Sequence, residues 1–300
     1  MRKDIAFKTT DGTTLRGWHY TPPGAGKHPT IVMAHGFSAV KEMYLDKYAE
    51  AFANAGIASV VYDNRNFGAS DGQPRQEIDP WLQIRDYSDA ITFAASLEQT
   101  DPVRIGVWGS SYSGGHVLVV AAIDRRVKCV VSQVPMVSGS QGFRRLVRAD
   151  FVAALQAQLH ADRAHRAAGG APTMVPAVAQ DPTAPSAMPT ADSWEWFTET
   201  AKARAPAWRN EVTARTLEYG FGYEPGAYIG QISPTPLLLI VAVNDHLAVS
   251  DLAIAAYQRA HEPKKLVLLP GGHFDAYVKE FDQSFEPARD WFRTHLAVSP

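Results

Sequence analysis

The chain has 300 residues, of which 46% are hydrophobic, and its 29 basic and 31 acidic residues give a formal net charge of -2. This length and apolar content can bury a large core, as one domain or as a domain with an insertion. The balanced charge argues against a nucleic-acid partner, and apolar runs of only strand length argue against a membrane span. The first residues lack an apolar stretch typical of a signal peptide, and a single cysteine excludes an internal disulfide, so we expect a cytoplasmic protein.

The first half of the chain alternates between strand-like and helix-like segments. An alternating stretch at 4–20 with a turn at Thr10-Asp11-Gly12 predicts an antiparallel hairpin at a sheet edge. Beyond it, buried apolar runs predict strands and helical periodicity predicts helices. In chain order these are strand 29–34, helix 44–55, strand 57–62, helix 80–97, strand 103–108, helix 117–123 and strand 127–131.

The pattern changes between residues 138 and 231. A long arginine-rich helical piece (142–168), a Pro/Ala-rich loop (169–189) and an aromatic run (194–197) occupy this stretch. Alternation then resumes with strand 237–243, helix 249–261, strand 265–269 and helix 286–295. Such alternation predicts an α/β protein with a mainly parallel sheet and helices on both faces. We assign residues 1–137 and 232–300 to this core and 138–231 to a helical cap over the carboxyl edge, where such sheets hold their sites.

The run GSSYSGG at 109–115 is the most informative motif. It joins a buried strand to an apolar helix, so it predicts a tight turn that lifts one side chain out of the sheet. Ser111 is the raised residue, with the small residues Gly109 and Ser113 two positions away on either side. The pattern departs from G-x-S-x-G because Ser113 stands where the second glycine usually does. A serine hydroxyl is a poor nucleophile at neutral pH, so it needs a base and an acid that orients the base.

A base and an acid follow later in the chain. Of the ten histidines, only His273 lies just past a predicted strand in a glycine-containing loop, where its imidazole can reach over the sheet edge. Asp245 follows the strand 237–243, and a carboxylate there can orient the imidazole and stabilise the imidazolium. Asp275 is the competing acid because it is close to His273 in sequence. The predicted order is Ser111, Asp245 and His273.

Four segments in this order resemble the α/β-hydrolase superfamily, whose nucleophile, acid and histidine follow one another along the chain. They are AHGF (34–37), YDNRNFGASDG (62–72), WGSSYSGG (108–115) and GGHFD (271–275). The second is similar to a D-x-R-G-x-G-x-S turn, with Asn66 replacing a glycine. The last two are most similar to the dienelactone-hydrolase-like branch and its fungal polyketide transferases and thiohydrolases. The resemblance covers residues 5–137 and 232–295 and implies an α/β-hydrolase fold with a cap insertion.

The resemblance also implies an oxyanion hole made by two backbone N–H groups. The first would belong to Tyr112, directly after the nucleophile, and the second to Phe37. Acyl transfer needs such donors aimed at the oxyanion that develops in the transition state.

Six side chains are further candidates for a substrate pocket. Arg144 and Arg148 would suit an anionic substrate such as a carboxylate or a CoA thioester, or they form a solvated face. Trp194 and Trp196 could line an apolar acyl pocket or pack in the core, and other aromatic residues of the expected cap, such as Phe221, could line the pocket with them. The remaining two candidates for the pocket wall are His35 and His246.

Together these features predict a serine hydrolase that cleaves a carboxylic ester or thioester of a small-molecule acyl substrate through an acyl-enzyme, without a cofactor. We expect no metal, because no Cys/His cluster or H-E-x-x-H motif offers metal-ligand spacing. An acyltransferase or an amidase/peptidase that uses the same three residues remains an alternative, as does a non-catalytic ligand receptor. Aromatic residues of the expected cap could also serve a homodimer interface.

Overall fold

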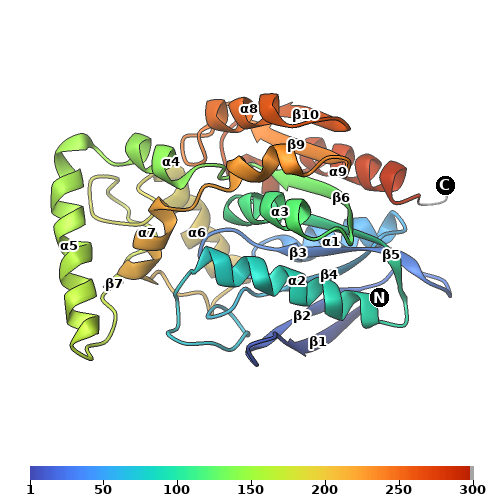
Figure 1. Cartoon of the computed structure of the whole chain (residues 1–300), viewed down its shortest axis with the longest axis horizontal. Coiled ribbons are helices and arrows are strands. Elements are labelled where there is room, and N and C mark those ends of the chain that lie inside the picture. Colours follow the sequence, from blue (N-terminus) through green and yellow to red (C-terminus); the bar gives the residue numbers. More distant parts are fainter. Residues whose placement is uncertain (298–300) are drawn as a thin grey trace.

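One eight-stranded sheet organises the protein, as a computed structural model that describes residues 1–297 shows (Figure 1). The strand order across the sheet is β1-β2-β4-β3-β5-β6-β9-β10. The strands are β1 (Arg2–Lys8), β2 (Thr14–Tyr20), β3 (His28–Ala34), β4 (Ala58–Tyr62), β5 (Thr100–Ser110), β6 (Val127–Gln133), β9 (Leu237–Ala242) and β10 (Lys264–Leu269).

The sheet is antiparallel at one edge and parallel elsewhere. The β1–β2 hairpin and the β2–β4 pair are antiparallel, whereas the strands from β4 to β10 pair in parallel. Because parallel strands share one direction, their carboxyl ends meet at one edge of the sheet. The loops after β3, β5, β9 and β10 all leave the sheet from this edge, so segments far apart in sequence lie together there.

Helices cover both faces of the sheet, as alternation along the chain predicts. α2 and α3 pack together on one face, and η1 (Pro225–Gln231) joins α3 to α8 on the same side. On the other face α1 and α9 meet through Phe52, which packs against Phe285 and Phe292. These core helices are α1 (Leu45–Asn54), α2 (Pro80–Ser96), α3 (Tyr112–Ile123), α8 (Ser250–Arg259) and α9 (Phe281–His295). The mostly parallel α/β fold is therefore confirmed.

Most of the segment 138–231 lies beyond one end of the sheet, at the left of Figure 1, whereas its last part, η1, packs against α3 and α8. The long helical piece predicted at 142–168 is two helices, because the backbone at Val147 and Arg148 is extended. The predicted loop at 169–189 includes a two-residue strand that pairs with a second short strand further on. The elements are α4 (Gly139–Leu146), α5 (Ala149–Ala167), β7 (Met174–Val175), α6 (Ala191–Arg204), β8 (Val212–Thr213) and α7 (Ala214–Phe221).

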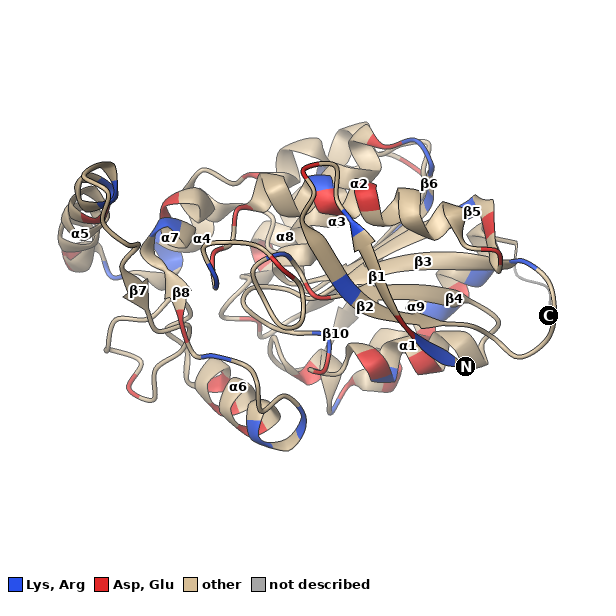
Figure 2. Cartoon of the chain, turned by 90° about the horizontal axis from the view of Figure 1, so that it is seen from below, with Lys and Arg blue, Asp and Glu red and all other residues tan. Residues whose placement is uncertain are grey.

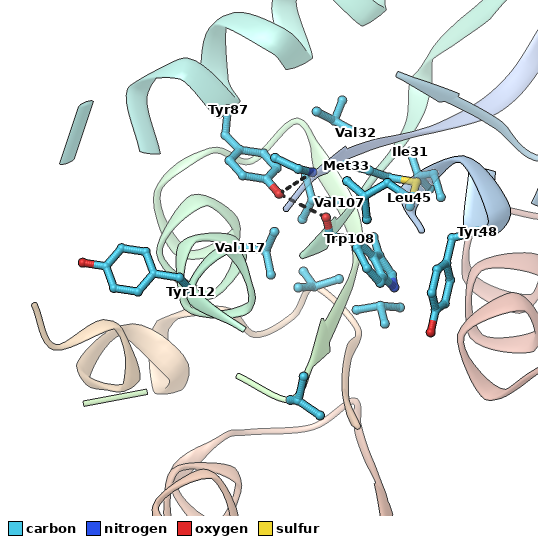
Figure 3. Close-up of a cluster of buried hydrophobic side chains, with 14 of the residues drawn as sticks. Ile31, Val32, Met33, Leu45, Tyr48, Tyr87, Val107, Trp108, Tyr112 and Val117 are labelled. Carbon is cyan, nitrogen blue, oxygen red and sulfur yellow. Dashed lines mark hydrogen bonds between the residues drawn. The ribbon is translucent and has the colours of Figure 1, made fainter. Parts of the chain in front are cut away.

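A buried tyrosine ties together two central strands just before they end. The Tyr87 hydroxyl donates a hydrogen bond to the Trp108 carbonyl at 3.1 Å and accepts one from the Ala34 N–H at 3.0 Å (Figure 3). Tyr87 projects from α2, and its side chain is fully buried. The contact fixes the relative position of β3 and β5, whose following loops carry AHGF and GSSYSGG.

Basic and acidic residues are interspersed along the helices, strands and loops (Figure 2). Within residues 1–297 no helix combines the length and the apolar character needed to cross a membrane. Across the same residues, no three His, Cys, Asp or Glu side chains gather as a metal ion would require.

Candidate active site

Ser111 lies in a strained turn between β5 and α3. Its backbone has φ 60° and ψ -118°, a conformation that a residue with a side chain adopts only when the surrounding structure enforces it. Gly109 is required here, since a Cβ atom on it would lie 2.1 Å from the Ser113 carbonyl oxygen. The turn raises the Ser111 hydroxyl above the carboxyl edge of the sheet, the geometry of a nucleophile elbow.

The loops after β9 and β10 bring an acid and an imidazole to this serine. His273 Nε2 lies 3.0 Å from Ser111 Oγ, and His273 Nδ1 lies 2.7 Å from Asp245 Oδ2. The side chains of Asp245 and His273 are each only 1% exposed. The other carboxylate oxygen of Asp245 accepts the N–H groups of Leu247 at 2.9 Å and Ala248 at 2.8 Å, which fixes the plane of the carboxylate. The three side chains predicted from the sequence therefore form one hydrogen-bonded chain.

The competing acid Asp275 has a different task. Its Oδ2 accepts the Gly272 N–H at 2.8 Å, and its Oδ1 forms an ion pair with Lys279. These contacts shape the loop that carries His273, while the imidazole itself bonds to Asp245.

The loop after β3 runs close beside Ser111. A Cβ atom on Gly36 would lie 2.7 Å from the Ser111 Cβ, so only glycine permits this approach. The next residue is Phe37, and neither its N–H nor that of Tyr112 donates to another described residue. Both residues line the same cavity as Ser111, so two amides without a described partner lie near the serine.

His35 supports this loop with both ring nitrogens. Its Nδ1 accepts the Gly36 N–H at 2.8 Å, so Nε2 carries the proton and donates to the Met43 carbonyl at 2.8 Å. Burial lowers the pKa of His35 to about 4, which keeps the ring neutral. The Ser113 hydroxyl donates to the His35 carbonyl at 2.5 Å and thereby links the elbow to the end of β3.

A second set of hydrogen bonds braces the loop that carries His273. The Tyr277 hydroxyl, on η2 (Asp275–Tyr277), lies 2.5 Å from the Ser110 hydroxyl. Tyr48 on α1 donates to the Ala276 carbonyl at 2.6 Å. All of these groups are buried, so the segment that follows His273 is tied to the elbow through Ser110 and to α1 through Tyr48.

An apolar cavity of about 140 Å³ opens from Ser111 into the segment 138–231. Its wall includes no charged residue, and most of it comes from aliphatic and aromatic side chains on α4, α5, α7 and the loop before α6. The apolar members include Phe37, Met136, Phe143, Leu146, Val147, Leu155, Met188, Leu217, Phe221 and Leu247. Sequence reasoning singled out none of these as pocket residues except Phe221, because apolar positions on a helix give no sign of which face meets a cavity.

None of the six predicted pocket candidates lines this cavity. Arg144 and Arg148 are exposed, and Arg148 pairs with Asp150 instead of facing the cavity. His246 is exposed although its neighbours Leu247 and Ala248 line the wall, because the turn after Asp245 points successive side chains in different directions.

The predicted tryptophans differ from each other. Trp194 is half-buried and packs against the hydrophobic core without lining the cavity. Trp196 is buried and stacks on Phe274, next to the catalytic candidate His273. With His35 it lines a void of only about 10 Å³ beside Ser111.

A histidine with no assigned context in the sequence lies behind the elbow. His116 on α3 is fully buried, with Nε2 donating to Gln83 at 2.9 Å and Nδ1 accepting the Tyr223 hydroxyl at 2.8 Å. Burial lowers its pKa to about 3, so it is neutral. It links α2, α3 and the segment that precedes η1.

The sheet order and the elbow between β5 and α3 define the chain as an α/β hydrolase. More narrowly, it belongs to the family described as X-Pro dipeptidyl-peptidase (S15 family), whose family model matches residues 11–275. Its relatives place it in the branch of fungal thiohydrolases and polyketide transferases.

Two relatives and one solved structure illustrate the similarity. Thiohydrolase aneE of Aspergillus aculeatus is 35% identical, over 88% of this chain and 83% of that protein. Polyketide transferase af380 of Aspergillus fumigatus is 33% identical, over 98% of this chain and 99% of that protein. The structure of DcsB in complex with its substrate analogue superposes with a TM-score of 0.88 at 28% identity, covering 99% of this chain and 100% of that one. These comparisons make the chain a member of a hydrolase and acyltransferase family.

Proposed function

We propose that this protein is a serine hydrolase that cleaves a carboxylic ester or thioester through an acyl-enzyme intermediate. The observation that carries the proposal is the hydrogen-bonded chain from Ser111 through His273 to Asp245, joined at 3.0 Å and 2.7 Å. A serine hydroxyl at a strained elbow, within hydrogen-bond reach of an oriented imidazole, is the arrangement that nucleophilic catalysis requires.

The roles follow from the hydrogen bonds. His273 Nε2 takes the hydroxyl proton as Ser111 Oγ bonds to the substrate carbonyl carbon, and the carbonyl electrons move to oxygen. The Phe37 and Tyr112 amides stabilise that oxyanion. Collapse expels the alcohol or thiol, which takes the proton from His273. Water then loses a proton to His273 as it attacks the acyl-enzyme carbonyl. Collapse breaks the bond to Ser111 Oγ, which takes the proton back from His273, and the acid is released, while Asp245 keeps Nδ1 protonated throughout.

The cavity supports an apolar acyl group as substrate. An uncharged wall binds such a group by removing its surface from water, whereas it offers no partner for a carboxylate or phosphate. Relatives named thiohydrolase support a thioester as the bond that is cleaved.

Acyl transfer is the second candidate, because relatives named polyketide transferase cover almost all of this chain. Transfer would follow the same steps with an alcohol or amine in place of water. The family description also keeps cleavage of X-Pro peptide bonds as an outcome to test.

Labelling with a fluorophosphonate probe tests the proposal directly. We expect one adduct per chain on the peptide that contains Ser111, its loss in Ser111→Ala, and full labelling of the control Ser140→Ala on α4. An adduct on Ser110 or Ser113, or no adduct on the wild-type protein, would overturn the mechanism.

Product analysis then separates the three reactions. Acyl thioesters are incubated with and without alcohol or amine acceptors, and an X-Pro anilide is assayed in parallel. Free acid formed at the same rate with and without acceptors indicates hydrolysis. A new ester or amide that replaces the acid indicates transfer, and release of the aniline indicates peptidase activity.

A further inference from the structure

The hydroxyl of Tyr112 is buried at the cavity without a protein partner. The side chain is only 5% exposed, and its oxygen makes no hydrogen bond to any described residue. Tyr112 lines the cavity with Ser111, as does Gly220, where a Cβ atom would lie 3.8 Å from the Tyr112 hydroxyl. In Figure 3 the Tyr112 ring points away from the packed side chains around Trp108. Its polar end therefore lies against the cavity wall.

The Tyr112 ring cannot turn easily toward another partner. It packs edge-on against Phe37 and His116, with ring centroids 5.6 Å and 5.1 Å away, and against Tyr223 at 5.3 Å. The two polar side chains that pack against the ring, His116 and Tyr223, already bond to each other, and His116 also bonds to Gln83. Burial also raises the pKa of Tyr112, so its hydroxyl stays protonated as a donor.

A second unpartnered hydroxyl lies in the same wall. Ser186 Oγ is buried without a described partner, and Ser186 lines both this cavity and an adjoining one of about 230 Å³. The other hydroxyls of the wall have protein partners: Ser138 caps α4, and Thr216 accepts the Ile78 N–H. Among the hydroxyl groups of the cavity wall, those of Tyr112 and Ser186 are therefore the ones that remain available to a ligand.

We propose that the Tyr112 hydroxyl, with Ser186 further along the cavity, recognises an oxygen atom carried by the acyl group, such as a ketone or hydroxyl. This inference rests on the proposed function, since it assigns the cavity to the acyl group of the substrate. A buried donor without a partner disfavours a saturated chain, which leaves it unpaired, and favours a chain that offers an acceptor. Tyr112 thus serves twice: its N–H faces the reacting carbonyl and its hydroxyl selects the chain.

Equilibrium binding tests the proposal independently of turnover. Carboxylic acids of equal chain length, one saturated and the others with a ketone moved carbon by carbon, are titrated by calorimetry into wild type, Tyr112→Phe, Ser186→Ala and the control Tyr228→Phe. Tyr228 lies on η1 and does not line either cavity. We expect wild type to prefer at least one ketone acid, and Tyr112→Phe to reduce that preference about three- to tenfold, as loss of one neutral hydrogen bond does. Tyr228→Phe should retain it.

The preference for the ketone-bearing chain over the saturated chain is then measured as the ratio of their kcat/KM values, with the corresponding thioesters as substrates. No preference for any ketone acid in wild type, or an equal preference in Tyr112→Phe and Tyr228→Phe, overturns the inference. Should Tyr112→Phe not fold, Ser186→Ala must show the reduced preference for the inference to stand. The proposed function would be refuted by a different result, namely no adduct on Ser111 and no turnover. The preference in binding of ketone acids over the saturated acid can be measured whether or not the protein turns over.

Discussion

Replacing Asp245 with asparagine would isolate the role of its carboxylate, because the structure dictates how the new amide must lie. The oxygen that accepts the Leu247 and Ala248 N–H groups can only be replaced by the amide oxygen. The amide NH₂ then faces His273 Nδ1, which must become an acceptor. The proton moves to Nε2, and the imidazole can no longer accept a proton from Ser111.

The expected loss in kcat is about 10⁴-fold, the scale known for a wrong imidazole tautomer in such a triad. This corresponds to about 5 kcal/mol of activation free energy. Steady-state hydrolysis of a chromogenic ester and the rate of fluorophosphonate labelling both report it. Asp275→Asn is the matched control, because that carboxylate holds Gly272 and pairs with Lys279. Its kcat should stay within a few-fold of wild type.

Two outcomes would contradict this reasoning. Asp245→Asn with more than a tenth of the wild-type kcat would mean that the carboxylate does not set the tautomer. An equal loss in Asp275→Asn would mean that the effect comes from disturbing the His273 loop. Thermal unfolding of each variant separates these outcomes from a loss of the fold.

Two further predictions concern stability. Tyr87→Phe leaves the buried Ala34 N–H without its bond, so the free energy of unfolding should fall by about 1–3 kcal/mol in urea denaturation, and a midpoint equal to wild type would refute the role of that contact. Burial lowers the pKa of His116 to about 3, so below about pH 6.5 the imidazole is protonated in the unfolded state but stays neutral in the folded state. The free energy of unfolding of the wild-type protein therefore falls as the pH falls. Glutamine at position 116 does not titrate, so the difference in free energy of unfolding between wild type and His116→Gln should shrink by about 1 kcal/mol between pH 7 and pH 5.5. A difference that stays constant with pH would contradict a neutral His116.

The sequence predicted the fold and the branch because both depend on local patterns. Strand-to-helix turns, glycines and the order of Ser111, Asp245 and His273 can be read along the chain, and the parallel sheet brings their loops to one edge. The fold class and the family are confirmed. The catalytic roles stay predictions, although the structure brings the three side chains into contact.

The pocket could not be predicted in the same way. Whether Arg144 or Phe143 faces the cavity depends on how α4 is rotated against α7, which no local pattern states. The break between α4 and α5 lacks a glycine or proline at Val147 and Arg148, so helical composition predicts one continuous helix. The helix predicted at 286–295 begins earlier in the structure, at Phe281, and Pro287 lies inside it.

The contact between Ser113 and the His35 carbonyl bears on the sequence patterns by which nucleophile elbows are found. The two small positions around Ser111 are not equivalent. At Gly109 the Ser113 carbonyl oxygen in the first turn of α3 leaves no space for a Cβ atom, whereas at position 113 a serine fits and donates a hydrogen bond of 2.5 Å. A search pattern that demands glycine at both positions would pass over this chain. One that demands glycine only before the nucleophile, and allows a small hydrogen-bond donor after it, would find it and any others built in the same way.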